Sequence, residues 1–375
     1  MPIPTDTITN VTMYELDVEL ARRFAVASGA LDLAQVAVVR IDLASGHHGW
    51  GEMAPFPAIT GETRDGTLEA ALQAAPALVG HSVLEYRRLF VDFKERLEGH
   101  AAARCGLETA LLDAYCRRLG VPLWAHFGGA ERTREHITDI TIPVTDLDTT
   151  VDLSRLYHAR GFRRFKLKVG VDVQLDIEKL SRVANACPDS AFVLDANAGY
   201  TLPDARRFLA GLSKGVCVLL LEQPLAAGDH EGARALRREF SVRVAADESA
   251  RSCADVIELA REGAADVINL KIMKTGVREA VQMAMVARSL GLSLMLGGML
   301  ETRLAMGCSF GLALGLGGFD YLDLDTPLLL QTDPWTGGYT YRGPVLLPWS
   351  DPGLGVEPAE GAAFSPCETV GLTRV

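Results

Sequence analysis

The sequence contains no closely spaced pair of cysteines. None of its seven cysteines forms a C-x-x-C pair, and their spacing matches no metal site. Isolated cysteines of this kind are typical of buried, reduced thiols rather than of zinc ligands. We therefore expect buried, unpaired thiols at Cys105, Cys116, Cys187, Cys217, Cys253, Cys308 and Cys367.

Long apolar runs and an excess of positive charge are also missing. The first ten residues, MPIPTDTITN, contain no apolar signal core, and no apolar stretch approaches about 18 residues without a charge or a glycine. We therefore expect a soluble, cytoplasmic protein without a membrane partner. Lysine and arginine number 37 against 48 acidic residues, a net charge of −11. Because nucleic-acid binding needs a basic surface, this balance argues against such a partner.

A ladder of charged residues runs along the C-terminal two-thirds of the sequence. From Lys168 to Lys271 its rungs are 24 to 27 residues apart, about the length of one strand, loop and helix. Each rung ends an apolar run of strand character, such as AFVLDAN or CVLLLEQP. The pattern predicts repeated β/α units with charges at the C-terminal ends of parallel strands. The rungs are Lys166 with Lys168, Asp195, Glu222, Asp247, Lys271, Glu301, and Asp323 with Asp325.

Three regions differ in their secondary-structure pattern. Residues 1–130 combine alternating strand patterns with helical periodicity, which predicts an α+β domain. Residues 131–328 alternate strand and helix, as an α/β barrel of parallel strands requires. Residues 329–375 are rich in glycine and proline, and we expect them to return to the first domain. Helices of the first domain are expected at 67–79, 84–97 and 102–119.

The glycine-rich segment GLALGLGG, residues 311–318, could suggest a phosphate-binding loop. It follows a predicted helix, however, and lacks the Gly-Lys-Ser/Thr ending of such loops. We therefore expect these glycines to allow close packing.

The strand FKLKV places two lysines on one face. Phe165, Leu167 and Val169 share the other face, because side chains alternate along a strand. In a barrel one face packs on helices and the other fills the interior, so Lys166 and Lys168 would need anionic partners there. Such a departure from an apolar interior indicates a functional site.

Three acidic residues end the next three strands. Asp195, Glu222 and Asp247 would converge at the barrel mouth, where their mutual repulsion is relieved by a hard divalent cation with oxygen ligands. No histidine or cysteine accompanies them, which disfavours zinc and copper. We expect one Mg²⁺ ion per subunit.

At these positions the chain resembles the enolase superfamily, in its muconate-lactonizing-enzyme-like branch. The resemblance covers nearly the whole chain. It implies an α+β capping domain on a modified (β/α)₇β barrel of the TIM type, Mg²⁺ held by the three carboxylates, and a lysine on each face of the substrate. The matching residues are Lys-x-Lys at Lys166 and Lys168, Asp-x-Asn at Asp195 and Asn197, Glu-Gln-Pro at Glu222, Asp-Glu-Ser at Asp247, and Lys271.

These residue types suit proton removal next to a carboxylate. The reaction adds negative charge to that carboxylate, which a bound metal stabilises more in the transition state than in the ground state. We expect Lys168 and Lys271 to act as acid and base on opposite faces, and we expect Lys166 and a nearby Mg²⁺ to disfavour the ammonium form of Lys168. Lys166 is expected to support the substrate carboxylate. Lys274 has the wrong strand parity to join Lys271 and is interpreted as a loop or helix-start lysine.

The last strand, YLDLDTP, discriminates among reactions of this branch. Asp323 and Asp325 share a face and could bind a substrate ammonium group. This Asp-x-Asp resembles the mark of dipeptide epimerases, including Ala-Glu epimerases, whose substrates have a free amine. The alternative is a turn and helix-cap pair. The resemblance also places Thr141, on the first barrel strand, in contact with the substrate.

Two other functions stay open at this point. One is an N-acylamino-acid racemase or o-succinylbenzoate synthase, and the other a catalytically silent metal- or peptide-binding relative. Histidine-base branches are disfavoured, because LSLMLGGMLE contains no histidine. Relatives often assemble into homo-oligomers. Side-chain specificity is expected to lie in two cap loops, 21–30 and 55–63, with opposing charges at Arg22, Arg23, Glu62 and Asp65.

Overall fold

The computed structural model describes residues 5–26, 29–129 and 135–372. Its N-terminal domain is built on an antiparallel sheet with the strand order β17-β1-β2-β3. In β1, Leu16, Val18 and Leu20 are buried while Asp17 and Glu19 are exposed, the alternation of a sheet with one covered face. The strands are β1 (Ile8–Val26), β2 (Gly29–Leu43), β3 (His48–Met53) and β17 (Ser365–Gly371).

Helices cover that sheet, and the central one approaches it closely. A Cβ atom at Gly51 of β3 would lie 1.9 Å from the carbonyl oxygen of Gly106, so only glycine fits between β3 and helix α4. The helices are α1 (Pro57–Thr60), α2 (Arg64–Ala74), α3 (Tyr86–Arg96), α4 (Ala101–Leu119) and α5 (Leu123–His126). The three helices expected for this domain are therefore present, with shifted ends.

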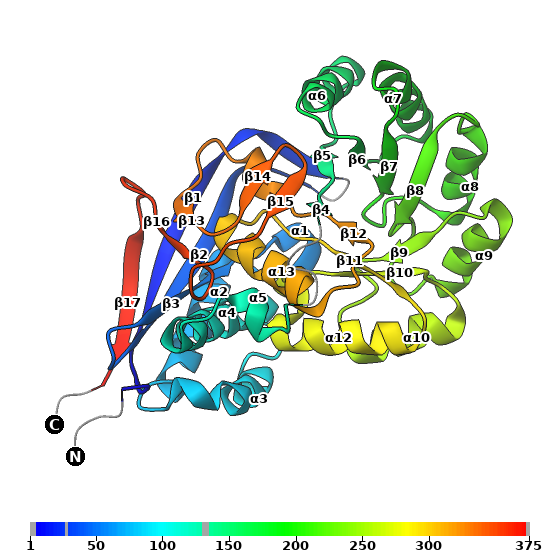
Figure 1. Ribbon diagram of the computed structural model, residues 1–375. Coiled ribbons are helices and arrows are strands. Elements are labelled where there is room, and N and C mark those ends of the chain that lie inside the picture. Colours follow the sequence, from blue (N-terminus) through cyan, green and yellow to red (C-terminus); the bar gives the residue numbers. More distant parts are fainter. Residues whose placement is uncertain (1–4, 27–28, 130–134, 373–375) are drawn as a thin grey trace.

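The second domain is the expected (β/α)₇β barrel. Eight parallel strands run in sequence order around the sheet, and helices lie outside it (Figure 1). The strands are β5 (Ile140–Ile142), β6 (Arg164–Lys168), β7 (Ala191–Asp195), β8 (Cys217–Glu222), β9 (Val244–Ala246), β10 (Val267–Leu270), β11 (Ser293–Leu296) and β12 (Tyr321–Leu322). The helices between them are α6 (Leu147–Ala159), α7 (Val173–Ala186), α8 (Leu202–Gly211), α9 (His230–Phe240), α10 (Cys253–Glu262), α12 (Val277–Ser289) and α13 (Arg303–Leu316), with the short α11 (Ile272–Thr275) before α12.

The first and last barrel strands meet through residues that precede β5. The amide of Asp139 donates to the carbonyl oxygen of Leu322 at 3.0 Å, and the amide of Leu324 donates to Thr138 Oγ1 at 2.8 Å. These bonds place Asp139 beside the end of β12, where Asp323 and Asp325 follow.

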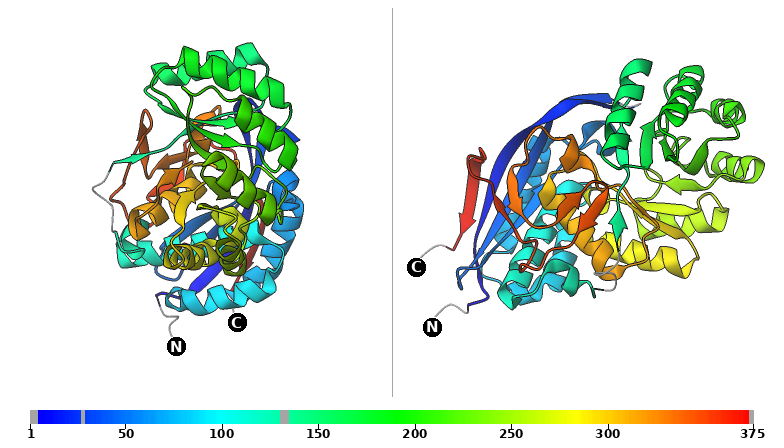
Figure 2. Two further views of the ribbon diagram at one scale, coloured as in Figure 1. Left: turned by 90° about the vertical axis from the view of Figure 1, so that its right-hand side faces the viewer. Right: turned by 45° about the horizontal axis from the view of Figure 1, so that its top comes forward.

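The C-terminal segment joins both parts of the molecule. Strands β14 (Thr340–Arg342) and β15 (Val345–Leu347) form a sheet with β4 (His136–Ile137), and β13 (Trp335–Gly337) pairs with β16 (Val356–Pro358). The final strand β17 pairs antiparallel with β1 and lies at the outer edge of the N-terminal sheet (Figure 2). The boundary expected at residue 130 falls outside the described residues.

The buried carboxylate of Glu52 connects the cap to the barrel. Glu52 of β3 accepts hydrogen bonds from the Thr302 amide at 2.8 Å and the Ala305 amide at 3.2 Å, at the start of α13. Burial raises the pKa of Glu52 to about 7. Because β3 and α13 come from different domains, this contact sets the position of the cap over the barrel.

The two segments expected as cap loops are largely ordered elements. Residues 21–26 and 29–30 continue the hairpin of β1 and β2, in which Phe24 pairs with Leu31. Residues 27 and 28 lie outside the described residues. Segment 55–63 contains helix α1. The hairpin runs from the outer sheet toward β5 (Figures 1 and 2), and its Ala25 carbonyl accepts from the Val144 amide at 2.8 Å.

The cysteine expectation is correct in bonding and partly wrong in burial. All seven thiols are free, but Cys217, the first residue of β8, and Cys367, in the edge strand β17, are exposed. Among the described residues no helix is long and apolar enough to cross a membrane.

Glycine at position 315 is expected to be required for stability. A Cβ atom there would lie 2.2 Å from Phe127 Cβ and 2.7 Å from the Trp124 carbonyl oxygen, so α13 and α5 would have to separate. This confirms the close packing predicted for GLALGLGG. Gly315→Ala should lower the free energy of unfolding by about 1–3 kcal/mol, measured by urea denaturation. Gly215→Ala is the control, since a Cβ atom there meets nothing within 4 Å. Equal effects of both changes would contradict the packing argument.

Candidate active site

Strand register brings the first charged residues into one row. Lys168 of β6 is the register partner of Asp195 in β7, which in turn pairs with Glu222 in β8. Neighbouring parallel strands in register present their side chains to the same side of the sheet. The three groups therefore reach the barrel mouth together, as the ladder predicted.

Lys166 lies at the centre of the acidic groups. Its Nζ is 3.0 Å from Asp195 Oδ2, 2.9 Å from Glu222 Oε2 and 2.7 Å from Asp323 Oδ2, and its side chain is 1% exposed. Three carboxylates from β7, β8 and the end of β12 thus supply the anionic partners that an inward lysine needs.

Lys168 has fewer partners and is closer to the mouth. Its Nζ donates to Asp195 Oδ2 at 2.6 Å and to Asn197 Oδ1 at 3.1 Å. Asn197 has a φ of 43°, a left-handed conformation that asparagine tolerates better than most residues. Both side chains of the Asp-x-Asn pair therefore accept hydrogen bonds from Lys168.

Asp247 is held by two lysines, one of which the sequence reasoning did not assign to the site. Lys271 Nζ lies 2.6 Å from Asp247 Oδ2, and Lys274 Nζ donates to Asp247 Oδ1 and, at 3.1 Å, to the Asn269 carbonyl oxygen. Lys274 does sit in a helix start, as expected, because α11 begins directly after Lys271. One helical turn brings positions 271 and 274 to the same side, so strand parity was the wrong criterion.

The carboxylates of Asp195, Glu222 and Asp247 fit a hard divalent cation. All three are completely buried. Burial and the charge of Asp195 raise the pKa of Glu222 to about 8, which shows how poorly its negative charge is compensated. Glu222 Oε2 and Asp247 Oδ2 lie near lysine nitrogens but receive no hydrogen bond of acceptable geometry. These oxygens are the donor atoms that Mg²⁺ prefers.

The carboxylates around Lys166 and Lys271 raise the pKa values of both lysines. Burial lowers the pKa of Lys166, but Asp195, Asp323 and Glu222 raise it more, so the net shift is upward. Burial lowers the pKa of Lys271 as well, but Asp247, Glu222 and Asp195 together raise it more, so its net shift is also upward. A divalent cation on the same carboxylates would oppose the upward shift.

A second acidic group lies where the barrel closes. Oxygen atoms of Asp139, Asp323 and Asp325 lie within 4.8 Å of one another, and all three residues are buried. Asp325 Oδ2 accepts from the Thr141 amide at 2.5 Å, and it makes no capping bond to the short 3₁₀ helix that follows it. Burial and Asp323 raise the pKa of Asp325 to about 7. The pair is therefore not a turn and helix-cap pair.

Asp139 is a residue that the sequence analysis missed. Its Oδ1 has no hydrogen-bond partner, and burial together with Asp323 and Asp325 raises its pKa well above the ordinary value. Asp139 and Thr141 have the same strand parity, which is the signal that could have identified it. A buried group of three carboxylates with free oxygens suits a small organic cation.

Glu301 lies beside the site without joining either acidic group. Its Oε1 accepts from the Met299 amide at 2.7 Å, and burial raises its pKa to about 8. It shapes the loop after β11, which carries Met299 to the mouth.

The barrel mouth is a small cavity of about 20 Å³. Its floor carries the charged residues described above, and its cover comes from the cap and from the loop after β11. The lining residues are Phe24, Phe56, Ile59, Thr141, Lys166, Lys168, Lys271, Gly298, Met299, Asp323 and Thr326.

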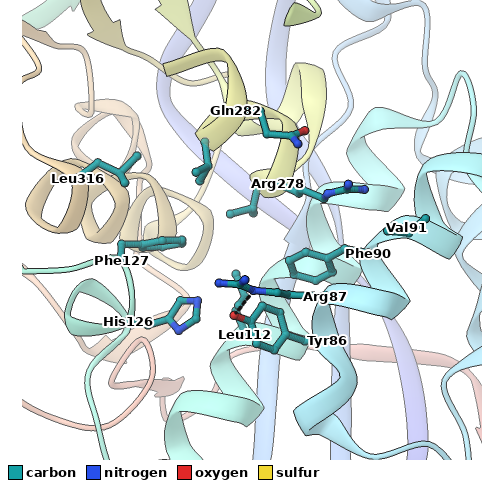
Figure 3. A pocket seen from close by; sticks show the side chains of 12 residues that line it. Tyr86, Arg87, Phe90, Val91, Leu112, His126, Phe127, Arg278, Gln282 and Leu316 are labelled. Atoms are coloured by element: carbon teal, nitrogen blue, oxygen red, sulfur yellow. Dashed lines mark hydrogen bonds between the residues drawn. The ribbon is translucent and has the colours of Figure 1, made fainter. Parts of the chain in front are cut away.

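A larger cavity of about 500 Å³ lies elsewhere, between helices of the cap and of the barrel (Figure 3). Arg87 Nε donates to Tyr86 Oη there at 3.1 Å, and aromatic rings form much of the wall. None of the described residues that line it is acidic. By size alone this cavity would be the better candidate for the active site. Proton transfer and metal binding, however, need the charged groups found at the barrel mouth.

Comparisons with known proteins agree with this architecture. Residues 8–128 match the family model of the mandelate racemase / muconate lactonizing enzyme N-terminal domain, and residues 149–362 match the enolase C-terminal domain-like model. An aromatic dipeptide epimerase of Herpetosiphon aurantiacus is 41% identical over 346 residues, covering 92% of this chain and 96% of that protein.

Solved structures show the same relationship. The substrate-liganded L-Ala-D/L-Glu epimerase of Bacillus subtilis has a TM-score of 0.90 at 30% identity, covering 93% of this chain and 98% of the other. A dipeptide epimerase of Enterococcus faecalis, complexed with Mg and L-Leu-L-Tyr, has a TM-score of 0.89 at 29% identity, with coverages of 93% and 99%. The sequence resemblance is thus confirmed, and the chain belongs to the mandelate racemase / muconate lactonizing enzyme family of the enolase superfamily.

Proposed function

We propose that this protein is an Mg²⁺-dependent dipeptide epimerase, an isomerase that inverts the α-carbon of the C-terminal residue by 1,1-proton transfer through an enediolate. The observation that carries the proposal is the order of groups across the barrel mouth. Three buried carboxylates lie between Lys168 on β6 and Lys271 after β10, and a separate acidic group lies at the end of β12. Relatives that include liganded dipeptide epimerases support it.

Each part of a dipeptide has a matching group. Asp195, Glu222 and Asp247 would hold one Mg²⁺, which when bound neutralises charge that develops on the substrate carboxylate. Lys166, which contacts Asp195 and Glu222, would add a positive charge beside that carboxylate.

Two lysines transfer the proton. Lys168 and Lys271 come from strands on different sides of the mouth, so each reaches one face of the α-carbon. One removes the proton, and the other returns a proton to the opposite face, which inverts the centre.

The second acidic group would bind the free amine. Asp323 and Asp325, joined by Asp139, supply the negative charge, and the amide of Thr141 fixes the orientation of Asp325. An acylated amino acid lacks an ammonium group and would leave these carboxylates without a cation.

Deuterium uptake tests the reaction directly. The purified protein with Mg²⁺ should catalyse incorporation of deuterium from D₂O into the C-terminal α-position of dipeptides, with formation of the L,D product. Mass spectrometry and chiral chromatography measure the two. Exchange in N-acylamino acids but in no dipeptide would instead identify an N-acylamino-acid racemase.

Asp325→Asn should weaken binding of the ammonium group selectively. The amide can still accept from the Thr141 amide, so the change removes mainly a charge. A charge-assisted hydrogen bond contributes about 1.5–3 kcal/mol, so kcat/KM for a dipeptide should fall about 10- to 100-fold. The same dipeptide with an acetylated amine is the control, and its slow turnover should be unaffected. An equal loss for both substrates would contradict the assignment.

The proposal also keeps three expectations from the sequence. These are the domain division at about residue 130, assembly into a homo-oligomer and a cytoplasmic location. Light scattering on the purified protein tests the second of them.

A further inference from the structure

The cap contributes only apolar side chains to the barrel mouth. Phe24 lies near the C-terminal end of β1, Phe56 directly precedes α1, and Ile59 lies within α1. Met299, from the loop after β11, completes the same cover. Phe24, Phe56 and Met299 are each at most 9% exposed. Among the described residues that line the cavity, all charged groups belong to the barrel floor.

The charged residues of the two cap segments point to other partners. Arg22 and Arg23 are exposed, and the nearest acid to Arg23 is Asp32 at 3.9 Å. Glu62 accepts from the Ala102 amide at 3.1 Å, at the start of α4. Asp65 is also exposed. In the sequence, these acidic and basic residues gave opposite indications of the preferred substrate side chain. None of them lines the mouth, so none of them indicates that preference.

Hydrogen bonds to the barrel hold the apolar cover in place. The Ala25 carbonyl oxygen, next to Phe24, accepts from the Val144 amide, and the Ile59 carbonyl oxygen accepts from Arg251 Nη2 at 2.9 Å. Both bonds fasten cap segments to loops that follow barrel strands. The cover is therefore part of the site rather than a remote surface.

The geometry of inversion directs one substituent toward this cover. The α-carbon of the reacting residue carries a carboxylate, a nitrogen, a hydrogen and a side chain. In the proposed function the carboxylate would face Mg²⁺ held by the three acidic residues, the nitrogen would lie toward Asp323 and Asp325, and the two lysines would take the faces on which hydrogen leaves and arrives. The remaining direction is the mouth, beneath Phe24, Phe56 and Ile59.

We infer that the residue inverted by this enzyme carries a large apolar or aromatic side chain, which packs against Phe24, Phe56, Ile59 and Met299. The inference rests on the proposed function and adds the substrate class. A cavity of about 20 Å³ holds about one water molecule, so the covering side chains must move outward when a substrate enters. They remain the surface that its side chain contacts. A carboxylate or ammonium there would lose its hydration without gaining a partner.

A matched set of dipeptides tests the inference. L-Ala-L-Phe, L-Ala-L-Leu, L-Ala-L-Ala, L-Ala-L-Glu and L-Ala-L-Lys are compared by kcat/KM for α-deuterium exchange with Mg²⁺. The phenylalanine and leucine substrates should exceed those with glutamate and lysine by about 100-fold or more, with L-Ala-L-Ala between them. A preference for glutamate or lysine would overturn the inference while leaving the epimerase proposal intact. Absence of exchange in every dipeptide would overturn both.

Two kinds of variant locate the determinant. Ile59 is partly exposed, so Ile59→Arg can fold, and it places a cation in the cover. The ratio of kcat/KM for L-Ala-L-Glu over L-Ala-L-Phe should rise about 10-fold or more. Arg22→Ala and Arg23→Ala are the matched controls and should leave this ratio unchanged. A selective loss of L-Ala-L-Glu turnover in either control would show that the hairpin charges set specificity, and would overturn the inference.

Discussion

Replacement of Lys271 by alanine should stop inversion while one substrate isomer still exchanges its α-proton. Lys271 and Lys168 stand on different sides of the mouth, so the variant keeps the base that serves one face. Removal of an acid or base costs about 10²–10⁴-fold, so we expect epimerisation to fall by at least about 10³-fold. Deuterium uptake into the L,L and L,D isomers, measured separately, should persist in only one of them.

Lys168→Ala should give the reciprocal result, with uptake only in the other isomer. Lys94→Ala is the control, because that lysine is exposed on α3 and pairs only with Glu279 among the described residues. If Lys271→Ala still inverted a dipeptide at within tenfold of the native rate, the assignment of two opposed bases would be wrong.

Replacement of Glu222 by glutamine should abolish activity without lowering stability. The glutamine oxygen can still accept from Asn269 Nδ2, which donates to Glu222 Oε1 at 2.8 Å, and Lys166 keeps Asp195 and Asp323 as partners. Because burial and Asp195 disfavour the ionised form of Glu222, a neutral amide costs the fold little. Turnover should nevertheless fall at least about 10³-fold, since metal-assisted stabilisation of the transition state is worth several kcal/mol.

Two measurements on this variant separate function from folding. Calorimetric titration should show weakened Mg²⁺ binding, and the melting temperature in the absence of metal should equal or exceed that of the native protein. Asp320→Asn, at an exposed acid just before β12, is the control for loss of one negative charge. Chelation should abolish native activity, and added Mg²⁺ should restore it. A variant that melts at a lower temperature and keeps its activity would contradict the role of Glu222.

The barrel and its polar row were predictable because both depend on local sequence periodicity. The spacing of the ladder places one charged residue at each strand end, and strand parity places Lys166 and Lys168 on one side. Register then carries Lys168, Asp195 and Glu222 to neighbouring positions. A series of apolar strands, each with a polar residue at its C-terminal end, is compatible with few folds other than a parallel barrel.

Two residues of the site were not predicted from the sequence, because their geometry departs from that periodicity. Lys274 follows a strand but lies in the single-turn helix α11, where spacing by three replaces spacing by two. Asp139 precedes β5, and only the closure of the barrel brings it beside Asp323. Both contacts depend on how a short irregular segment folds, which apolar patterning does not encode.

Residue type and period were sufficient to assign the barrel, the lysines of the ladder and its carboxylates to strand ends, but they did not identify Asp139. The cover of the mouth, in contrast, follows from the packing of the cap on the barrel. Phe24 and Phe56 lie far in the sequence from the barrel residues of the site, and their position depends on how two domains pack. Because of the same packing, the mouth is not lined by Arg22, Arg23, Glu62 or Asp65. Contacts between domains depend on the complementarity of whole surfaces, and no local pattern in the chain expresses it.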